Sequence, residues 1–468
     1  MPAALTQAHS SYLLMNILIL GAGQVGSTAA YQLAREEANE VTIVDKDPAA
    51  LKSLSDRLDV RTVIGHAAYP STLQRAGVAD ADMIIALTRS DEVNMIACQI
   101  AFTMFGTKTK IARIRAAEYS NAPNLFHQNA MPVDVWISPE QLVTEHIQQL
   151  ILFPGAFQVL EFAGGKVQMA GVKARRDGRL VGEELRELHH HLPTIEARVA
   201  AIYRDGLSIP PEGDTLIQED DEVFFVAAAK DLHGVMPEMR KLERSVRSVV
   251  IAGGGNIGFR LAKALEGTNQ VKLIERDKDR AKLISERLEN TIVLTGDAAD
   301  ENLLLEENID SADVFCALTN AEEANILSAM LAKKLGCKKV MALINRPAYA
   351  ELVEDSGGID VAISPQQITI GSLLAHIRLG DVVKVHSLRR GRAEAIEAIA
   401  HGKPGESKVV GKTIEDIKLP SGTNISLIIR GEKIMQAHHD TMVEEDDHLI
   451  LFMTDRRQTD NVERLFAM

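Results

Sequence analysis

The chain has 468 residues, of which 46% are hydrophobic, and a formal net charge of −14 at pH 7. The apolar fraction is enough for each of several domains to bury a core. The acidic balance argues against a nucleic-acid partner, because phosphate neutralisation needs a basic face. The sequence has no uninterrupted apolar run of about 18 residues, as a membrane span needs, and the cysteines form no CxxC pair, which is typical of a reducing cytosol. We therefore expect a soluble, cytoplasmic protein.

The first 14 residues allow two interpretations. Residues 1–14 have no basic n-region, and their apolar end runs straight into an apolar strand, so they do not resemble a signal peptide. Met15 could be the natural start, because the strand begins there. The alternative is a genuine, flexible N-terminal extension.

The first informative motif is the glycine-rich turn Gly21-Ala-Gly23-Gln-Val-Gly26. The apolar run Ile17-Leu-Ile-Leu20 precedes it, and Asp45 ends the next apolar run, 45 − 21 = 24 residues after the first glycine. A lone GxGxxG is weak evidence. A strand before it, a helix after it and a carboxylate roughly twenty residues on are the context that makes it specific. The pattern predicts binding of a dinucleotide or an adenine nucleotide.

The same pattern returns in the second half of the chain. The turn Gly253-Gly-Gly255-Asn-Ile-Gly258 follows an apolar run, and Glu275 ends the next such run, 275 − 253 = 22 residues on. The repeat extends beyond the glycines, as from Ala86-Leu-Thr88 to Ala317-Leu-Thr319, an offset of 317 − 86 = 231. This period is too long for a solenoid unit. It indicates tandem duplication of a two-lobed module.

Within each large lobe, apolar strands alternate with polar helices. Short continuous apolar runs suit strands buried on both faces, so the expected fold is α/β, with two tandem Rossmann-like, doubly wound parallel-sheet lobes, each followed by a small α+β lobe. Strands are expected near residues 16–20, 41–45, 60–64, 82–87, 110–114 and 133–137, and helices at Ser27 to Arg35 and Asp91 to Phe105. The expected domains are an N-terminal extension (1–14), a first large lobe (15–140), a first small lobe (141–232), a second large lobe (247–366), a second small lobe (367–457) and a C-terminal tail (458–468).

The small lobes carry no recognisable catalytic set. Between Gln158 and Ala227, and between Val383 and Met453, short β-branched runs alternate with turns, without a Ser/His/Asp set, an activated cysteine or a framed carboxylate pair. Neither catalytic residues nor a metal site are expected. Three consecutive histidines, His189-His-His191, point in different directions on a helix, which favours a solvated face over a metal site.

Longer runs identify a family. They are Ile17-Leu-Ile-Leu-Gly-Ala-Gly-Gln-Val-Gly, Ile111-Ala-Arg-Ile-Arg115, Asp360-Val-Ala-Ile-Ser-Pro-Gln-Gln367 and Glu394-Ala-Ile-Glu-Ala-Ile-Ala-His401. From Met15 onward the chain resembles the TrkA-like cytosolic nucleotide-binding subunits of bacterial Trk potassium-uptake systems, which are built from two RCK units.

The resemblance implies a regulator rather than an enzyme, with NAD(H), or ATP and ADP as alternative ligands, bound by the large lobes. It also implies a homo-oligomer, as a ring, that is peripheral at the inner face of the cell membrane and biases the opening of a membrane-embedded Trk-type potassium-translocating subunit. An NAD-dependent dehydrogenase and a purely structural ring remain as alternatives. A dehydrogenase needs a second domain with an acid or base over the nicotinamide, and the small lobes offer none that can be named.

The motif assigns roles within each turn. The first glycine allows the tight bend, the second lets the backbone approach the phosphates, and the third lets the helix pack on the strand. The N–H groups that open the helix face the phosphates. Asp45 and Glu275 should accept hydrogen bonds from ribose hydroxyls, which favours NAD(H) over NADP(H). The neighbouring cations Lys46 and Arg276 weaken that preference. The expected binding residues are Gly21, Ala22, Gly23, Gln24, Val25, Asp45, His66, Thr88, Arg89, Arg113 and Arg115 in the first half, and Gly253, Gly254, Gly255, Asn256, Ile257, Glu275, Asp297 and Thr319 in the second.

The two halves differ in charge at the pocket edge. Aligning the copies gives three pairs: Arg113 with Leu343, Arg115 with Asn345 and His66 with Asp297. Arginine suits a bidentate grip on polyphosphate, so the first pocket is expected to favour ATP and the second the dinucleotide. The alternative is that the arginines only form ion pairs at the surface. Thr88 and Thr319 end their strands at the ligand edge, and their alternative role is a helix cap.

A crossover helix is expected after each large lobe, at Glu140 to Leu152 and at Gln366 to Arg378. The first carries a helical stripe of apolar residues: Leu142, Val143, Ile147 and Ile151. In RCK-like proteins such a helix packs against a neighbour. The alternative is a helix that covers its own sheet.

Overall fold

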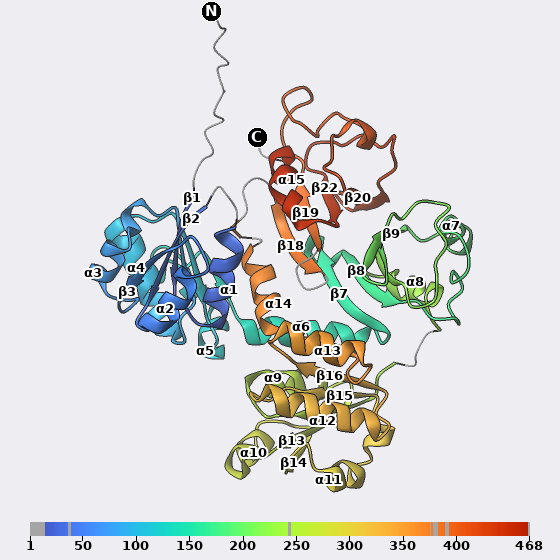
Figure 1. The fold of residues 1–468 in the computed structure, drawn as a ribbon, viewed down its shortest axis with the longest axis horizontal. Coiled ribbons are helices and arrows are strands. Elements are labelled where there is room, and N and C mark those ends of the chain that lie inside the picture. The colour runs from blue at the N-terminus through green and yellow to red at the C-terminus, as the bar shows by residue number, and fades with distance from the viewer. Residues whose placement is uncertain are drawn as a thin grey trace, which may run out of the picture. The chain divides into compact units, whose positions relative to one another are not determined.

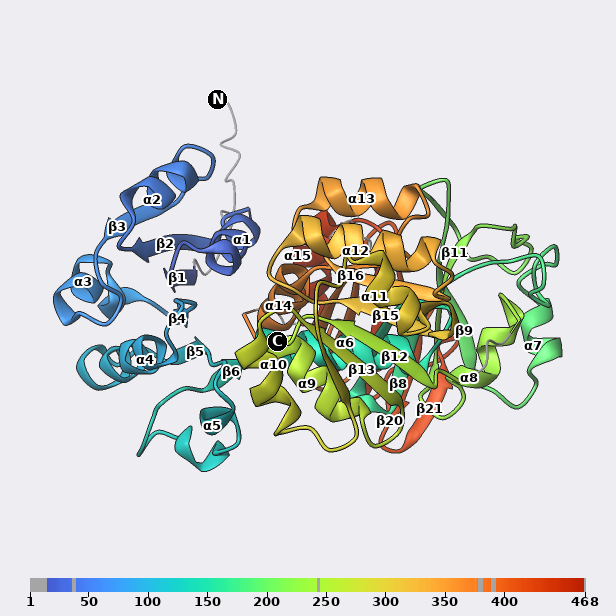
Figure 2. The same cartoon turned by 90° about the horizontal axis from the view of Figure 1, so that it is seen from below.

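The computed structural model describes residues 15–35, 39–241, 245–374, 376–377, 382–388 and 393–466. The predicted N-terminal extension, residues 1–14, lies outside them. The chain divides into two compact units, Met1–Pro139 and Glu140–Met468. Figures 1 and 2 label the helices and strands of both units.

The first unit is built on a six-stranded parallel sheet in the order β3-β2-β1-β4-β5-β6. Its strands are β1 (Met15–Leu20), β2 (Asn39–Asp45), β3 (Arg61–Ile64), β4 (Met83–Ala86), β5 (Thr109–Arg113) and β6 (Val135–Ile137). Its α-helices are α1 (Gln24–Leu33), α2 (Pro48–Ser55), α3 (Pro70–Arg75), α4 (Asp91–Phe105) and α5 (Ala117–Ser120). The strand order reverses direction between β1 and β4, which is where a doubly wound sheet forms its ligand crevice.

The second large lobe repeats this topology in the order β14-β13-β12-β15-β16-β17. Its strands are β12 (Ser248–Ala252), β13 (Gln270–Glu275), β14 (Ile292–Thr295), β15 (Val314–Ala317), β16 (Lys339–Leu343) and β17 (Val361–Ile363). Its helices are α9 (Asn256–Leu265), α10 (Lys278–Ser285), α11 (Glu301–Glu306), α12 (Glu322–Lys334) and α13 (Pro347–Asp355). One face of the sheet packs on α11, α12 and α13 and the other on α9 and α10. The Rossmann-like prediction is confirmed for both halves.

Each small lobe is a five-stranded antiparallel sheet, in the orders β10-β9-β11-β8-β7 and β18-β19-β22-β20-β21. The first contains β7 (Ala156–Phe162), β8 (Val167–Lys173), β9 (Ala197–Arg204), β10 (Leu207–Ile209) and β11 (Glu222–Ala228), with α7 (Glu187–His191) and α8 (Leu232–Val235). The second contains β18 (Val382–Leu388), β19 (Ala393–Ile399), β20 (Thr423–Arg430), β21 (Lys433–Gln436) and β22 (His448–Met453). The sheets pack together through a shared apolar cluster that includes Phe162, Phe224 and Phe452.

The predicted C-terminal tail contains a helix. Helix α15 (Thr459–Phe466) places Val462 and Phe466, four residues apart on one face, in the core of the second small lobe. The segment is therefore part of that lobe's packing. The exact domain boundaries remain a prediction.

The crossover helix α6 (Pro139–Leu152) buries apolar residues in a core that it shares with the first small lobe and the second large lobe. Val143, Ile147 and Ile151 lie in one core cluster with strands of the second parallel sheet. The Nζ of the buried Lys339, on β16, donates to the carbonyls of Leu150 at 3.1 Å and Ala156 at 2.9 Å. Within its own chain, the helix therefore packs in a core that the second large lobe and the first small lobe share, and its packing against another subunit stays a prediction. A charge at Ile147 would therefore disrupt the core of the single chain.

The second crossover helix is α14 (Pro365–Leu374), and its Leu373 is also fully buried. Within the described ranges, every helix is too short or too polar to cross a membrane.

Candidate functional site

Both glycine-rich turns adopt the backbone that the motif requires. Gly21 and Gly253, at the first position, have φ of 105° and 106°, a left-handed region that disfavours other residues. At the third position, a Cβ on Gly26 would lie 1.8 Å from the carbonyl oxygen of Gly21, and a Cβ on Gly258 would lie 1.9 Å from that of Gly253. Only glycine lets the helix start this close to the strand that precedes it.

The second glycine of each turn faces open space. Apart from atoms of the adjacent backbone, no heavy atom of the described residues lies within 4 Å of a Cβ built on Gly23 or Gly255. Each is the N-cap of its helix and makes no side-chain capping bond. The first helical hydrogen bonds run from Ser27 N to Gly23 O at 2.8 Å and from Phe259 N to Gly255 O at 2.9 Å. The N–H groups of Gln24, Val25, Asn256 and Ile257 therefore precede the helical hydrogen-bond ladder and carry the positive end of the helix dipole.

In the first half, Asp45 connects two backbone turns. Its Oδ2 accepts from Ala22 N at 2.6 Å and its Oδ1 accepts from Asp47 N at 2.9 Å. The carboxylate at the end of β2 is thereby fixed beside the glycine-rich turn, as the motif predicts. Each oxygen retains capacity to accept a further hydrogen bond.

In the second half, Glu275 performs the same task with a longer side chain. It accepts from Gly254 N at 2.8 Å and from Asp277 N at 2.9 Å. A Cβ on Gly254 would lie 2.3 Å from Ile284 Cδ1 and 2.9 Å from Glu275 Oε2. Arg280 adds a contact that the sequence did not indicate, because its Nε donates to Gly254 O at 2.7 Å.

The end of β4 is held by a buried asparagine that the sequence analysis did not assign to the site. Asn94 accepts from the N and Oγ1 of Thr88 at 2.9 and 2.7 Å, and donates to the carbonyls of Thr88 and Arg113. Asn325 repeats the arrangement with Thr319 and Leu343. Asn94 and Asn325 recur at an offset of 325 − 94 = 231, which equals the offset between the two threonines. This recurrence is the sequence signal that could have assigned the asparagines to the site.

The threonines are not the helix caps. The N-cap of α4 is Ser90, whose Oγ accepts from Val93 N at 3.3 Å, and the N-cap of α12 is Ala321. The hydroxyls of Thr88 and Thr319 donate instead to the asparagines. Gly21 packs directly on this strand end, because a Cβ there would lie 3.1 Å from Thr88 N.

An acidic residue at the start of the next helix holds the turn after β5. The buried Asp91 accepts from the backbone N of Arg115 and of Ala116, both at 2.8 Å. In the second half Glu322 accepts from the N of Asn345 at 2.9 Å and of Arg346 at 2.8 Å. The two halves thus share a second carboxylate at the same edge of the sheet.

The structure changes the expected difference in guanidinium groups. Arg115 lies 3.7 Å from Asp91 and donates to the carbonyl of Arg89. Arg346, in the other half, lies 3.5 Å from Glu322. The alignment paired Arg115 with Asn345, so this one-residue shift hid the second arginine. Arg113, half-buried at the end of β5, has no arginine counterpart, because Leu343 occupies that position, and Arg89 likewise aligns with Asn320.

His66 and Asp297 occupy matching turns after β3 and β14. Ala68 N donates to His66 Nδ1 at 3.3 Å, and Ala299 N donates to Asp297 Oδ1 at 2.9 Å. The His66 ring stacks on Tyr69 with centroids 4.5 Å apart. Each side chain therefore closes its own turn while differing in charge from its counterpart.

All three cysteines are buried, and burial raises the pKa of each thiol to about 12. They are Cys98, Cys316 and Cys337. Thiols with such pKa values stay protonated at neutral pH and are poor nucleophiles.

Comparisons with known proteins agree with this architecture. The TrkA-N domain family matches residues 17–139 and 249–365, and the TrkA-C domain family matches residues 169–240 and 404–467. Among solved structures, the GsuK RCK domain is similar with a TM-score of 0.61 and 18% identity, covering 97% of this chain and 95% of that one. The GsuK channel bound to NAD has a TM-score of 0.60 and 18% identity, covering 97% and 79%. At this identity the two structures establish the fold alone.

Curated relatives are much more similar in sequence. The chain is 59% identical over 454 residues to the Trk system potassium uptake protein TrkA of Halomonas elongata, covering 97% of this chain and 99% of the relative. It is 55% identical over 453 residues to that of Vibrio alginolyticus, covering 97% and 98%. The chain therefore belongs to the TrkA family of Trk system potassium uptake proteins.

Proposed function

We propose that the chain is a regulatory subunit that binds NAD(H), or ATP and ADP, in its two large lobes and controls a membrane-embedded potassium-uptake protein. The observation that carries the proposal is the duplicated site: a glycine-rich turn, open helix N–H groups and a fixed carboxylate, at the switch point of each sheet. The names of the relatives identify the transport system.

The residues present fit a nucleotide. The open space at Gly23 and Gly255 leaves room for phosphate oxygens against the backbone, and the N–H groups that open α1 and α9 point their dipoles there. Asp45 and Glu275 end the strands next to those that precede the glycine-rich turns, and their carboxylates can still accept hydrogen bonds from ribose hydroxyls. A carboxylate at this position repels a 2′-phosphate, so NAD(H) is favoured over NADP(H).

Binding regulates only if the nucleotide prefers one conformation. A ligand with equal affinity for two conformations shifts no population. Asp91 ties the turn after β5 to the first site, and Glu322 ties the turn after β16 to the second. A ligand that displaces the adjacent arginine can therefore alter that turn. We place the subunit in a homo-oligomeric ring, peripheral at the inner face of the membrane beneath its potassium-translocating partner.

A regulatory role fits the chemistry of the site better than hydride transfer. The hydroxyls of Thr88 and Thr319 are committed to asparagines, and the buried thiols have pKa values of about 12. Neither group is poised as an acid or base beside a nicotinamide. The alternative, an NAD-dependent dehydrogenase, would need a donor or acceptor substrate.

Calorimetric titration with NADH and with ATP tests the binding. We expect up to two sites per chain, with one lost in Asp45→Asn and the other in Glu275→Gln. Asp416→Asn, an exposed carboxylate in the second small lobe, is the matched control. Absence of binding of either nucleotide to the unmutated protein would overturn the proposal. Incubating the protein with NADH and a panel of carbonyl acceptors should leave the absorbance of NADH unchanged, and a steady loss would favour the dehydrogenase.

A further inference from the structure

One peptide unit of each glycine-rich turn is held by a side chain. In the first turn, the hydroxyl of Ser27, on α1, donates to the carbonyl oxygen of Ala22 at 2.8 Å. In the second turn, the Nε of Arg280, on α10, donates to the carbonyl oxygen of Gly254 at 2.7 Å. The equivalent carbonyl of the motif is therefore bound in both halves, by different side chains from different helices.

Neither side chain has an equivalent in the other half. Ser27 follows the third glycine directly, and the residue at that position in the second turn is Phe259, which has no hydroxyl. Arg280 lies 280 − 277 = 3 residues after the aspartate that caps α10, and Ala50 lies 50 − 47 = 3 residues after the aspartate that caps α2. The two halves thus make the same contact with unrelated residues, which indicates that the contact itself is required.

The bound carbonyl sets the direction of the N–H group in the same peptide unit. Every peptide bond in the described part of the chain is trans, and a trans peptide is planar, so its C=O and N–H point in opposite directions. A hydrogen bond to the carbonyl of Ala22 therefore fixes the N–H of Gly23, and one to that of Gly254 fixes the N–H of Gly255. Within the described ranges neither N–H has an acceptor, and beside each glycine lies open space. Both are donors available to a ligand.

The strength of the restraint follows the freedom of the backbone. Ala22 lies between two glycines, whereas Gly254 belongs to a run of three, Gly253 to Gly255. Glycine adopts more backbone conformations than alanine, so the peptide unit after Gly254 can reverse its direction more easily than the one after Ala22. A guanidinium makes a stronger, charge-assisted hydrogen bond than a hydroxyl does. The stronger restraint therefore lies in the half with the freer backbone.

We propose that Ser27 and Arg280 are positioning residues of the first and second nucleotide sites, an inference that rests on the nucleotide binding proposed for the turns. Each holds the carbonyl of the residue between the first two glycines and thereby directs the next N–H at a phosphate oxygen of the ligand. Without this hydrogen bond the peptide unit is free to reverse, and its carbonyl oxygen then faces the phosphate and repels it. Ala22 with Ser27, and Gly254 with Arg280, are two ways of meeting one requirement.

Calorimetric titration with NADH tests the proposal one site at a time. In the Asp45→Asn background only the second site binds, and Arg280→Met there should weaken NADH binding about tenfold or more. In the Glu275→Gln background only the first site binds, and Ser27→Ala should weaken it about threefold to tenfold, because a neutral hydrogen bond is lost. Adenosine, measured by competition with NADH, lacks phosphates, and its affinity should change less than about twofold at either site.

Rescue separates positioning from general damage. Ser27→Thr keeps a hydroxyl and should bind NADH nearly as well as the unmutated first site. The double variant Ser27→Ala, Ala50→Arg copies the arrangement of the second half into the first. Because Ala50 is half-buried at the start of α2, an arginine there has room to extend towards the turn. We expect the double variant to bind NADH more tightly than Ser27→Ala alone.

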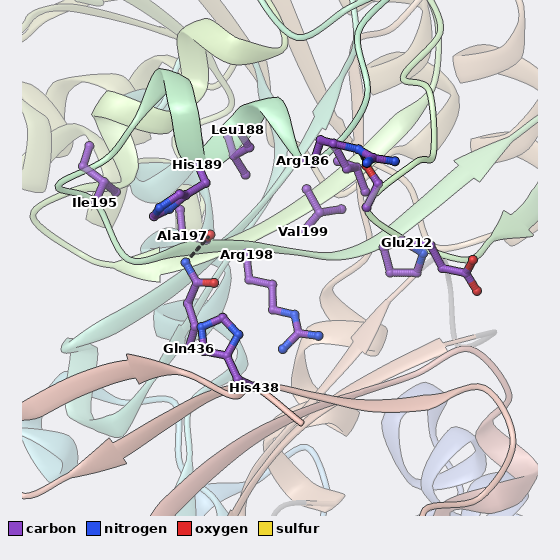
Figure 3. A pocket seen from close by; sticks show the side chains of 13 residues that line it. Arg186, Leu188, His189, Ile195, Ala197, Arg198, Val199, Glu212, Gln436 and His438 are labelled. Atoms are coloured by element: carbon purple, nitrogen blue, oxygen red, sulfur yellow. Dashed lines mark hydrogen bonds between the residues drawn. The ribbon is translucent and has the colours of Figure 1, made fainter. Parts of the chain in front are cut away.

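Two control variants address charge and distance. Lys278→Met removes an exposed cation from the same helix as Arg280, so it measures the part of any loss that comes from charge alone. His189→Gln changes an exposed side chain in a cavity formed by residues of the small lobes (Figure 3). Both variants should leave NADH affinity unchanged. A loss in Lys278→Met as large as that in Arg280→Met would overturn the positioning role.

Three further results would overturn the proposal. They are unchanged NADH affinity in both Arg280→Met and Ser27→Ala, an equal loss of affinity for adenosine, and a double variant that binds NADH no better than Ser27→Ala. An unmutated protein that binds no NADH would overturn both this proposal and the function proposed for the turns. Normal NADH binding that none of the variants weakens would overturn the positioning roles alone.

Discussion

The two glycine-rich turns reach the same backbone geometry with different side chains. In the first half a short acid, Asp45, is paired with Ala22, and in the second a longer acid, Glu275, is paired with Gly254. In the second half a Cβ on Gly254 would lie 2.3 Å from Ile284 Cδ1 and 2.9 Å from Glu275 Oε2, so the space that a methyl group takes at Ala22 is occupied there. Both halves therefore keep a hydrogen bond from a backbone N–H of the turn to the carboxylate. The two residues that form it differ together, as Ala22 with Asp45 and as Gly254 with Glu275.

The second turn is also held from another side. Arg280 donates to Gly254 O, whereas the corresponding residue of the first half, at 280 − 230 = 50, is Ala50. The first turn lacks this particular restraint. Two sites with the same hydrogen-bonding frame thus differ in how firmly the turn is fixed, which is a physical basis for different responses to a ligand.

The largest expected effect comes from the glycines that the two halves share. Gly26→Ala and Gly258→Ala each push a methyl group onto a backbone carbonyl, at 1.8 and 1.9 Å in the present geometry. Overpacking of this kind costs about 1–3 kcal/mol when neighbours can shift, and a backbone atom shifts with difficulty, so we expect about 3 kcal/mol or more for each. Urea denaturation measures the free energy of unfolding.

The second glycine of each turn, three residues before the third, provides the control for these two substitutions. Gly23→Ala and Gly255→Ala introduce a methyl group into open space at φ of −71° and −64°. We expect a change in the free energy of unfolding of only about 0.5–1 kcal/mol, but a clear loss of NADH affinity, because the methyl occupies space meant for phosphate. Equal stability losses at the second and third glycines would contradict this division of roles.

The pairing of acid and turn residue predicts a compensating exchange. Gly254→Ala should destabilise the protein by about 1–3 kcal/mol, and adding Glu275→Asp should recover part of it by recreating the pair of the first half. A double-mutant cycle from thermal or urea unfolding gives the coupling energy, expected at about 0.5–3 kcal/mol. Strict additivity would show that the contact with Ile284, 2.3 Å from the new Cβ, accounts for the whole cost.

The sequence predicted the large lobes well because their signals are local. Buried parallel strands, a glycine-rich turn and an acid at a fixed spacing specify the sheet and its ligand edge together, and α4 has the predicted bounds Asp91–Phe105. Helix α1 begins at Gln24 rather than at Ser27, because the helix starts inside the glycine motif itself. Asp45 and Glu275 lie where the spacing placed them.

What the sequence did not reveal depends on contacts between distant segments. The stripe on α6 predicted a buried face, but periodicity does not specify the partner surface, which includes the second parallel sheet and the first small lobe. The role of Asn94 requires the ends of β4 and β5 to meet. Arg346 could not be found by aligning the repeats, because the alignment pairs Arg115 with Asn345. Arg115 and Arg346 nevertheless reach equivalent acids, from positions that differ by one residue in this alignment.

The difference in arginines gives a test of ligand preference. Because Leu343 replaces Arg113 in the second half, Arg113→Ala should weaken ATP binding to the first half about 10-fold or more, since a charge-assisted hydrogen bond contributes about 1.5–3 kcal/mol. NADH binding should change less, as its pyrophosphate carries fewer charges. Arg346→Ala, which removes an arginine from the second half, is a control and should affect only the second site. Calorimetry that shows equal losses for both nucleotides in Arg113→Ala would remove the case for specialised pockets.

The smallest expected effect concerns two histidines that one repeat has and the other lacks. His146 on α6 corresponds to Ser372 (146 + 226 = 372), and His386 on β18 corresponds to Leu160 (386 − 226 = 160). Burial, assisted by Lys339, lowers the pKa of His146 to about 4, and burial, assisted by Lys384, lowers that of His386 to about 4. Nε2 of the His386 ring lies 2.9 Å from the carbonyl oxygen of Glu161, which suits a neutral imidazole that donates its proton.

These pKa values fix the sign of a pH effect. Because the folded state binds the histidine protons more weakly than the unfolded state, whose pKa is about 6.5, stability is full above about pH 6.5 and falls as the pH drops towards 4. Between about pH 7 and 5.5 we expect a loss on the order of 1 kcal/mol for each histidine. Urea unfolding across this range should show a shallower decline for His386→Gln, whose amide can still donate to Glu161, than for the unmutated protein. Parallel declines in the two proteins would mean that other groups cause the acid sensitivity.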